Sequence, residues 1–391
     1  MCARAIQMLT PPCAFILSNI SNMSMENIAL YRKYRPQDFS EIIGQEHIVK
    51  TLTNAINSGA ISHAYLFSGP RGSGKTTMAR IFAKAVNCAG KSGKKPCNNC
   101  DSCLEIMASK SMDLVEIDAA SHTGVDDVRE LIDGLKFAPV KSKYKIFIID
   151  ECHQLSKSAS NALLKTLEEP PSHAIFLLAT TEAHKMIPTI ISRCQRFDFK
   201  RLHVPEIIKK LEFIAKKEGI KFEPAAISLI ALNARGSFRD AESLLDKCVS
   251  FSGKDNLVTA QEIKELLGIV EVGQISKFVD FIVRHNAKEA ILLLNNLVEE
   301  GVDLQEFAKT LIFYLRQSLL FKINSDLLDR ETSGMTKEEI EKIKAQVLEL
   351  SEKDIQTMLE LFIDAENTMK YATILQLPLE LAVVDITHKE S

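Results

Sequence analysis

The sequence contains no tryptophan, and only 6% of its 391 residues are aromatic. Proteins that bind nucleic acid by stacking bases need exposed aromatic rings, so this composition argues against stacking as the main mode of recognition. The sequence also lacks any apolar run near the ~20 residues that a membrane-spanning helix requires. We therefore expect a cytoplasmic protein with no membrane partner.

The net charge and the number of cysteines indicate little about the partners of the chain or about disulfide bonds. The formal net charge is −3. Residues 26–201 carry 24 Lys and Arg against 19 Asp and Glu, a balance of +5, whereas residues 202–391 carry 23 against 32, a balance of −9. This asymmetry permits nucleic-acid contact through the first half without requiring it. The nine cysteines are odd in number and partly clustered, which is unlike a disulfide framework.

The hydrophobic pattern predicts an α/β part followed by a helical part. Up to about residue 201, apolar strands alternate with helical stretches, which predicts a parallel sheet with helices on both faces. The expected strands are Ala64–Ser68, Leu114–Asp118, Lys145–Asp150 and Ile175–Thr180, and the helices between them include Val125–Leu135 and Ser158–Leu167. Apolar residues then recur at helical spacing, and the expected helices are Pro205–Glu218, Pro224–Asn233, Asp240–Ser250, Ala287–Glu300, Asp303–Phe321, Lys337–Ser351 and Lys353–Tyr371.

This pattern divides the chain into four segments. Residues 1–25 are expected to be a disordered leader or to precede a true start near Met25. Residues 26–201 form the α/β domain, residues 202–267 a small domain of three helices, and residues 268–391 an all-helical domain. With 46% apolar residues, the chain has enough hydrophobic content for several separate cores.

The strongest local motif is Gly69-Pro-Arg-Gly-Ser-Gly-Lys-Thr76, which matches the phosphate-binding loop G-x-x-x-x-G-K-[ST]. An apolar strand precedes it and an unbroken helical stretch follows it, which favours a working loop over a glycine-rich turn before an ordinary helix. Backbone N–H groups of such a loop bind phosphate at a helix N-terminus. Lys75 is expected to reach the β- and γ-phosphates and the Thr76 hydroxyl to hold Mg²⁺. The expected nucleotide-binding residues here are Gly69, Pro70, Arg71, Gly72, Ser73, Gly74, Lys75, Thr76 and Thr77.

Two carboxylates end the predicted strand Lys145–Asp150. We expect Asp150 to coordinate Mg²⁺ and Glu151 to polarise an attacking water, with Thr180, at the end of a neighbouring strand, orienting that water. Alone, the two acids are equally consistent with a charged surface edge, but beside a phosphate loop they favour nucleotide hydrolysis. Asp150-Glu-Cys-His153 also spells a helicase-like box and a thiol–imidazole pair. No Q-x-x-R motif follows it, and adjacent side chains point apart, so we assign neither role.

Four cysteines lie within sixteen residues, at the spacing C-x8-C-x2-C-x2-C. Thiolates this close can surround a tetrahedral Zn²⁺ with no open position, which is typical of a structural zinc site. An iron–sulfur cluster is the rival, although the fourth spacing and the flanking Pro96 do not match its usual pattern. Four unrelated free cysteines are the remaining alternative. The expected zinc ligands are Cys88, Cys97, Cys100 and Cys103.

Two arginines are candidates for contact with a γ-phosphate. Arg193, in Ser192-Arg-Cys194, reads by itself as a surface residue or an ion-pair partner, but across a subunit boundary it would stabilise charge on a neighbour's nucleotide. Arg239 begins the third helix of the small domain and is expected to reach the phosphates of its own chain.

In these motifs the chain resembles the gamma/tau subunits of bacterial DNA polymerase III, which are AAA+ clamp-loader ATPases. The resemblance covers about residues 30–268, and the rest of the chain matches only as a helical domain in the expected place. The stretches that carry it are Tyr31-Arg-Lys-Tyr-Arg-Pro36, Phe39, Ile43-Gly-Gln45, Gly69–Thr76, the four-cysteine insertion, Asp150-Glu-Cys-His153, Ala162-Leu-Leu-Lys-Thr-Leu-Glu-Glu-Pro170, Ser192-Arg-Cys194 and Gly236-Ser-Phe-Arg-Asp-Ala241.

The resemblance implies an AAA+ domain at residues 26–201 with a zinc module at 88–103, a lid at 202–267 and an oligomerising collar at 268–391. It implies ATP hydrolysis in a pentameric ring with further copies of the chain and subunits of delta and delta-prime type, within a DNA-directed DNA polymerase holoenzyme. ATP binding would open the sliding clamp around primed DNA, and hydrolysis would release it during replication. Single-strand-binding or polymerase subunits are further expected partners.

The resemblance also implies residue roles. Arg32, Arg35 and Pro36 would contact the base and phosphates of ATP, Arg193 would act on a neighbour's nucleotide, and Arg239 would be the second sensor.

Two other functions remain as alternatives. A non-enzymatic ring subunit of delta-prime type needs no phosphate loop, so the intact Gly74-Lys75-Thr76 argues against it. A branch-migration ATPase is disfavoured by the cysteine insertion and by the absence of a terminal DNA-binding domain. The chain ends at Ser391, without the long extension of tau-type products that binds helicase and polymerase. A short gamma-like product, a shorter family variant and a trimmed chain remain open, as does the preference between ATP and dATP.

Overall fold

The computed structural model describes residues 29–387, apart from residues 91, 92, 94, 122, 136, 252–256, 269–271, 325–340, 342, 343 and 349. The predicted leader at residues 1–25 lies outside the described residues. The chain divides into two compact units, of which the first comprises the described residues of Met1–Gly219 and Ile230–Lys247, and the second those of Ile220–Leu229 and Cys248–Ser391. None of the helices in this described part is both long and apolar enough to cross a membrane.

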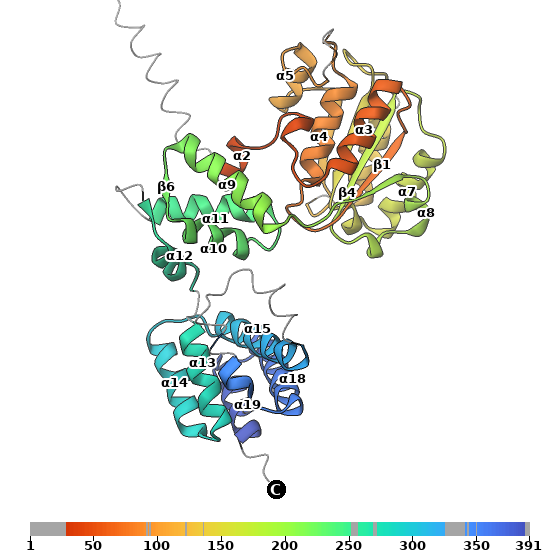
Figure 1. Ribbon diagram of the computed structural model, residues 1–391. Coiled ribbons are helices and arrows are strands. Elements are labelled where there is room, and N and C mark those ends of the chain that lie inside the picture. The colour runs from red at the N-terminus through yellow and green to blue at the C-terminus, as the bar shows by residue number, and fades with distance from the viewer. Residues whose placement is uncertain are drawn as a thin grey trace, which may run out of the picture. The chain divides into compact units, whose positions relative to one another are not determined.

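The first unit contains a parallel five-stranded sheet in the order β2-β3-β4-β1-β5. Its strands are β1 (Ala64–Ser68), β2 (Leu114–Asp118), β3 (Lys145–Asp150), β4 (Ala174–Thr180) and β5 (Gln195–Asp198). Figure 1 labels two of these strands, β1 and β4. The predicted parallel sheet is confirmed, with β1, β2 and β3 at the predicted bounds and β4 one residue longer at its start. The prediction missed β5, an edge strand in which only Phe197 is buried, because it lacks the apolar run that marks the other strands.

Helices cover both faces of this sheet. Side chains alternate between the faces of a strand. Tyr65 and Phe67 therefore pack with α3 (Glu46–Ser58) and α4 (Lys75–Val86), whereas Ala64 and Leu66 pack with α6 (Val125–Gly134) and α7 (Lys157–Glu168). Every residue of β1 and β4 is buried, as expected for central strands of a parallel sheet. The helices and 3-10 turns of this part are α2 (Leu30–Lys33), η1 (Phe39–Glu41), α3 (Glu46–Ser58), α4 (Lys75–Val86), α5 (Asp101–Met107), α6 (Val125–Gly134), η2 (Cys152–Gln154), α7 (Lys157–Glu168), η3 (Ala183–Lys185) and α8 (Pro188–Ile191).

Strand register brings the candidate site residues to one edge of the sheet. Ser68 of β1 lies opposite Thr180 of β4, and Asp118 of β2 lies opposite Asp150 of β3. The N–H of Gly69 donates a 3.2 Å hydrogen bond to the Thr180 carbonyl. The phosphate-loop match therefore starts beside the ends of β3 and β4, at the carboxyl edge where ligands bind in open α/β sheets.

Short helices follow the sheet, namely α9 (Val204–Glu218), α10 (Pro224–Asn233), α11 (Phe238–Phe251) and α12 (Ala260–Leu267), together with a parallel pair of two-residue strands, β6 (Lys221–Phe222) and β7 (Leu257–Val258). The predicted bounds hold for α10 and lie within two residues for α9 and α11. A capping box between His203 and Glu206 starts α9. The Ser237 hydroxyl accepts a 3.2 Å hydrogen bond from the Asp240 N–H, which sets the start of α11 earlier than predicted.

The second unit contains a helical bundle made of α13 (Val272–Val283), α14 (Ala287–Glu299), α15 (Leu304–Ile323), α18 (Glu352–Met369) and α19 (Leu377–Thr387). Its core includes Phe278, which meets Phe307 edge-on with ring centroids 5.2 Å apart. Side-chain caps begin several of these helices, for example Asp303 before α15. The helices predicted at Ala287–Glu300, Asp303–Phe321 and Lys353–Tyr371 are present within two residues. Of the helix predicted at Lys337–Ser351, residues 341 and 344–348 are helical, and residues 337–340, 342, 343 and 349 lie outside the described residues.

Candidate functional site

The phosphate-loop match lies against two other segments, and this closeness requires its glycines. Gly72 has a φ of +73°, and a Cβ there would lie 1.9 Å from the Ser237 hydroxyl just before α11. Gly69 has a φ of +149°, and a Cβ there would lie 2.5 Å from the Phe199 carbonyl oxygen. A side chain at either position would displace its neighbour, so only glycine fits.

Lys75 is the first residue of α4 and is 5% exposed. Its Nζ donates 2.9 Å hydrogen bonds to the carbonyl oxygens of Gly69 and Pro70. Burial lowers the pKa of Lys75, while the nearby carboxylates of Glu151 and Asp150 oppose that shift. The ammonium is thus held inside the loop by neutral carbonyls, where the oxygens of a bound phosphate would compete for its donors.

Thr76 and Asp150 bring two oxygen ligands together. The Thr76 hydroxyl donates a 2.6 Å hydrogen bond to Oδ2 of Asp150. The other carboxylate oxygen of Asp150 accepts a 3.0 Å hydrogen bond from the N–H of Glu151. A hydroxyl and a carboxylate beside a phosphate loop match the ligands that Mg²⁺ takes when phosphates fill its remaining positions. The residues present therefore fit a magnesium ion.

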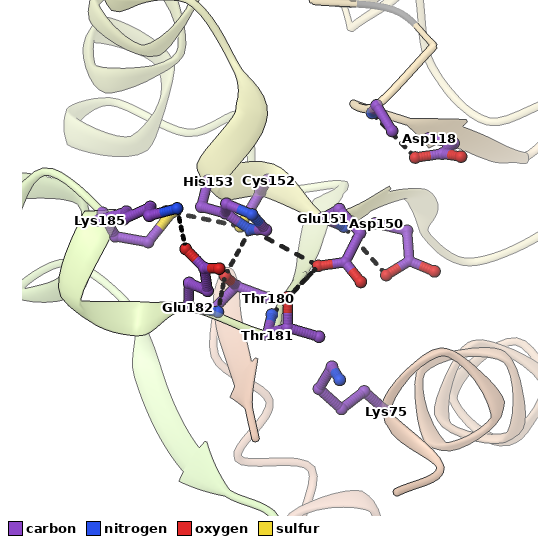
Figure 2. A network of polar contacts seen from close by, with 12 residues as sticks. Lys75, Asp118, Asp150, Glu151, Cys152, His153, Thr180, Thr181, Glu182 and Lys185 are labelled. Atoms are coloured by element: carbon purple, nitrogen blue, oxygen red, sulfur yellow. Dashed lines mark hydrogen bonds and ion pairs between the residues drawn. The ribbon is translucent and has the colours of Figure 1, made fainter. Parts of the chain in front are cut away.

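Glu151 is held by the turn that follows β4 (Figure 2). Its Oε2 accepts hydrogen bonds from the N–H and the hydroxyl of Thr181, at 3.1 and 2.8 Å. The same oxygen lies 3.5 Å from Nδ1 of His153. The backbone of Glu151 is left-handed, with φ 46° and ψ 42°, a conformation that is uncommon for a non-glycine residue and that is enriched at functional sites. Thr181 is therefore the direct partner that fixes this carboxylate.

The Thr180 hydroxyl faces a different set of groups. It lies 3.0 Å from Nδ1 of His153 and accepts a 3.0 Å hydrogen bond from the N–H of Glu182. Among the described contacts, its link to Glu151 runs through His153. The sequence indicated Thr180 but missed Thr181 and gave His153 no role. Successive residues of a strand point in opposite directions, and the sequence does not tell which of two adjacent threonines faces the carboxylates.

Cys152 and His153 point into different surroundings. Cys152 is buried, its Sγ lies 3.5 Å from the Met186 sulfur, and burial raises the pKa of its thiol. The imidazole of His153 faces Thr180 instead (Figure 2). The thiol is therefore a protonated core group, with no hydrogen bond to the imidazole among the described contacts.

A pocket of the first unit extends from the phosphate loop toward the N-terminal segment, α9 and α11. It unites the predicted Arg35, Pro36, Asp150, Glu151 and Arg239 with the loop itself. Gly69 and Pro70 belong to the loop without lining the pocket, and Thr180 does not line it either. The lining residues are Tyr31, Arg35, Pro36, Glu41, Ile42, Ile43, Arg71, Gly72, Ser73, Gly74, Lys75, Thr76, Thr77, Asp150, Glu151, Lys210, Phe238, Arg239 and Glu242.

Positive charge gathers on one side of this pocket. Arg35 and Arg239 line both it and an adjoining basic pocket, which the predicted Arg32 also lines. The Arg239 guanidinium carbon lies 5.3 Å from the ring centroid of Tyr31. Burial lowers the pKa of Arg35, and the charges of Arg80 and Arg239 add to that shift. Neither Arg35 nor Arg239 pairs with an acid in the described part of the chain, which leaves both available to phosphate.

Three charged residues of the pocket had no counterpart in the sequence prediction, namely Glu41 of η1, Lys210 and Glu242. Lys210 comes from α9 and Glu242 from α11. Burial raises the pKa of Glu242 to about 7, against the opposing charges of Lys210 and Arg35. No motif contains these residues, and only the packing of the helices brings them to the pocket.

Arg193 lies apart from the pocket of its own chain. It follows α8, and its guanidinium donates a 2.7 Å hydrogen bond to Oε1 of Glu168 and a 2.8 Å hydrogen bond to the Thr189 carbonyl. The Arg193 and Glu168 side chains are 33% and 51% exposed. A pair this exposed contributes little to stability, so Arg193 can leave it at small cost.

The four predicted zinc ligands lie together. Their sulfur atoms are all within 4.8 Å of one another. The N–H groups of Gly90 and Cys97 point at the sulfur of Cys88, both at 3.4 Å. Backbone N–H groups of Asn99 and Cys100 lower the pKa of Cys97 to about 6. Closely grouped sulfurs that accept backbone hydrogen bonds match a tetrahedral Cys₄ zinc site.

Three family models match the chain. They are described as "DNA polymerase III, delta subunit" over residues 44–203, "DNA polymerase III clamp loader subunit, ATPase lid domain" over residues 206–254, and "DNA polymerase III subunits gamma and tau domain III" over residues 258–391.

Curated relatives are similar over most of this chain. DNA polymerase III subunit tau of Bacillus subtilis (strain 168) is 44% identical over 92% of this chain and 63% of that protein. Subunit tau of Escherichia coli (strain K12) is 42% identical over 78% of this chain and 47% of that protein. Subunit gamma of Buchnera aphidicola subsp. Acyrthosiphon pisum is 36% identical over 91% of this chain and 98% of that protein. The chain thus spans 47% and 63% of the two tau subunits and nearly all of this gamma subunit.

Among solved structures, the Thermotoga maritima RuvB Holliday junction branch migration motor is 20% identical to the chain, with a TM-score of 0.45. The similarity covers 64% of this chain and 79% of that one.

Proposed function

The chain belongs to the family of DNA polymerase III gamma and tau subunits, and we propose that it is an ATP-hydrolysing subunit of a clamp loader. In this role it binds and hydrolyses ATP so that a sliding clamp is placed on primed DNA during chromosomal replication in the cytoplasm. The observation that carries the proposal is the 2.6 Å hydrogen bond between Thr76 and Asp150. It joins the phosphate loop to the end of β3 and sets a pair of magnesium ligands beside Glu151.

Nucleotide binding depends on groups already aimed at the loop. The N-terminus of α4 and the backbone of Gly72–Thr77 surround the phosphates. Lys75 exchanges its two carbonyl acceptors for phosphate oxygens, which are stronger partners for an ammonium group. Arg239 supplies a second cation from α11. Arg35 and Pro36 lie on the side of the pocket where the nucleotide continues beyond its phosphates.

Hydrolysis depends on Glu151 and on a magnesium ion. Thr76 and Asp150 would hold the ion, which when bound neutralises charge on the β- and γ-phosphates. Glu151 accepts a hydrogen bond from the attacking water and so orients it. In the structure this carboxylate accepts both of the hydrogen bonds that Thr181 donates. Glu151 must therefore exchange those hydrogen bonds for the water, and Thr180 supports the exchange through His153.

Assembly with other subunits completes the site in this proposal. Arg193 leaves Glu168 and contacts the γ-phosphate bound by a neighbouring chain, where it stabilises charge in the transition state. The partners are further copies of this chain and subunits of delta and delta-prime type in a pentameric ring, the clamp, and primed DNA. Polymerase or single-strand-binding subunits are partners through the holoenzyme.

We assign domain roles on the same basis. Residues 26–201 are the AAA+ ATPase domain, residues 202–267 the lid, and residues 268–391 the collar that holds the ring together. The matches to a lid model over 206–254 and to gamma and tau domain III over 258–391 support this division. Cys88, Cys97, Cys100 and Cys103 hold a structural zinc ion, a role supported by the grouping of their sulfurs.

Steady-state ATP hydrolysis tests the proposal. The chain is assayed alone, and then with delta-type and delta-prime-type subunits, the clamp and primed DNA. We expect slow turnover by the chain alone and strong stimulation by the complete set. Lys75→Ala should abolish both rates, whereas the exposed Lys50→Ala on α3, outside the pocket, should change neither. Turnover that survives Lys75→Ala would rule out this loop as the ATPase site.

A further inference from the structure

Glu242 is a buried carboxylate that has no hydrogen-bond partner among the described residues, although the charges of Lys210 and Arg35 act on it. The residue is 5% exposed and lines the nucleotide pocket. Within the described part of the chain, no hydrogen bond or ion pair reaches its carboxylate oxygens. A carboxylate taken out of water without hydrogen bonds is unfavourable, and native proteins rarely keep one. Its position on the wall of a pocket indicates that a ligand supplies the missing donor.

The position of Glu242 along α11 identifies which half of a nucleotide it meets. The start of α11 lies at the phosphate loop, because the Ser237 hydroxyl packs against Gly72. Phe238, Arg239 and Glu242 lie on one face of the helix and all line the pocket. At ~1.5 Å per residue, Glu242 lies about 7.5 Å along the helix axis from Ser237. A nucleotide whose phosphates fill the loop extends its sugar and base into this part of the pocket.

The rest of the lining agrees with a nucleoside. Ile42 and Ile43 provide apolar surface for a base, as does Pro36 of the N-terminal segment. Pockets for small molecules combine such apolar walls with a few placed polar groups that set specificity. Lys210 is one of these polar groups, but its Nζ already donates a 3.2 Å hydrogen bond to the Tyr34 carbonyl.

We propose that the carboxylate of Glu242 accepts a hydrogen bond from the nucleoside half of the bound nucleotide and thereby determines which nucleoside triphosphate the chain prefers. The donor is either the ribose 2′-hydroxyl or the 6-amino group of adenine, the two donors that distinguish ATP from dATP and from a triphosphate of unsubstituted purine. The inference rests on the proposed ATPase function. A carboxylate built to receive a donor rejects an analogue that lacks it, because the carboxylate is then left unpaired.

The same hydrogen bond links nucleotide binding to pH. Free Glu242 has a pKa raised to about 7 by burial, and a donated hydrogen bond favours its ionised form. The charges that act on it are those of Lys210 of α9 and Arg35 of the N-terminal segment. The other charged groups that line the same pocket are Glu41 of η1, Arg239 of α11, Arg71 and Lys75 of the phosphate loop, and Asp150 and Glu151 after β3. Nucleotide binding at pH 6 must therefore expel a proton from Glu242, whereas at pH 8 the proton is already absent.

Equilibrium binding to the full chain tests the proposal. The probes are the magnesium complexes of ATP, dATP and purine riboside triphosphate. The variants are Glu242→Leu, which removes the acceptor, and Glu242→Gln, which keeps an acceptor that cannot ionise. Asp240→Asn is the matched control, since Asp240 is an exposed acid on the same helix and does not line the pocket. Lys75→Ala reports binding that does not use the phosphate loop.

We expect the wild type to bind ATP about tenfold or more tightly than the one analogue that lacks the donor, since a hydrogen bond to a charged group is worth at least that factor. Glu242→Leu should reduce this preference to less than about twofold, and Asp240→Asn should keep it. The change in ATP affinity between pH 8 and pH 6 should also differ between the two proteins. The wild type should lose about tenfold more affinity over this range than Glu242→Gln does. Titration of the nucleotide's own phosphate is common to both proteins and cancels.

Two results overturn the inference, and they differ in what else they reject. If the wild type binds ATP but Glu242→Leu leaves every preference unchanged, Glu242 does not contact the nucleoside and only this inference fails. If the wild type binds no nucleoside triphosphate, the proposed ATPase function fails with it. If Glu242→Leu loses the preference for ATP over dATP, the donor is the 2′-hydroxyl. If it loses the preference for ATP over purine riboside triphosphate, the donor is the 6-amino group.

Discussion

Replacing Glu242 with glutamine should stabilise the nucleotide-free protein, and only above mildly acidic pH. Burial raises the pKa of this carboxyl from its ordinary 4.5 to about 7. Since one pH unit between the folded and unfolded pKa corresponds to ~1.4 kcal/mol, the ionised carboxylate lowers the free energy of unfolding of the first unit by about 3 kcal/mol at pH 8. Glutamine has nearly the same shape and carries no charge, so it removes this penalty.

The sign of the effect follows from proton binding. A carboxyl group with a raised folded-state pKa binds its proton more tightly in the folded protein. Its penalty is therefore absent below the unfolded pKa of 4.5, grows between pH 4.5 and about 7, and is constant above that. The stability difference between Glu242→Gln and wild type should be near zero at pH 4.5 and about 3 kcal/mol at pH 8.

Scanning calorimetry of the nucleotide-free proteins measures this difference across that pH range. The transition that shifts when Mg-ATP is added identifies the first unit, and Asp240→Asn controls for removal of an exposed charge. A stability difference that is the same at every pH would refute the assignment of a raised pKa to Glu242. A Glu242→Gln protein that is less stable than wild type at pH 8 would show that the carboxylate has a partner in the folded state.

Three further predictions concern other parts of the site. Thr181→Val removes the hydroxyl that holds Glu151 but keeps the backbone N–H, so ATP turnover by the isolated chain should rise several-fold, to about tenfold at most; an unchanged or lower rate would contradict this restraining role. Arg193→Ala should leave ATP binding intact but lower clamp- and DNA-stimulated hydrolysis about 100-fold or more. Glu168→Gln should change the free energy of unfolding by less than about 0.5 kcal/mol and keep full stimulation. An equal loss of stimulation in both variants would mean that hydrolysis depends on the ion pair and not on Arg193 alone. Metal analysis should find about one zinc per chain, and Cys97→Ser should lose the zinc and lower the melting temperature; iron, or no metal at all, would remove the zinc assignment.

The sequence predicted the strands best where turn or polar residues bound an apolar run, whether the strand is buried, as β1 is, or partly exposed, as β2 is. β1, β2 and β3 stand at their predicted bounds because turn residues bound each apolar run. β5 escaped prediction because its side chains alternate between solvent and core and only Phe197 is buried. The start of α11 differed from the prediction by two residues, since Ser237 both caps the helix and packs against Gly72.

In the candidate site, too, some residues could be predicted from the sequence and others could not. The phosphate loop and the two acids after β3 lie in contiguous motifs whose chemistry is readable residue by residue, and the structure brings them together. Thr181, Lys210 and Glu242 belong to no motif. Their roles depend on which face a strand end presents and on how α9 and α11 pack beside the loop, which are tertiary properties that local patterns do not encode.

A clamp-loading assay tests the central claim most directly. The complete set of subunits, primed DNA and a labelled clamp are mixed with ATP, and clamp retained on DNA is counted for wild type, Lys75→Ala and Glu151→Gln. We expect wild type to load clamps, Lys75→Ala to bind neither ATP nor clamp productively, and Glu151→Gln to bind ATP and form the ternary complex without releasing the clamp onto DNA. Loading by Lys75→Ala at the wild-type rate would contradict the proposal that ATP in this pocket drives clamp loading.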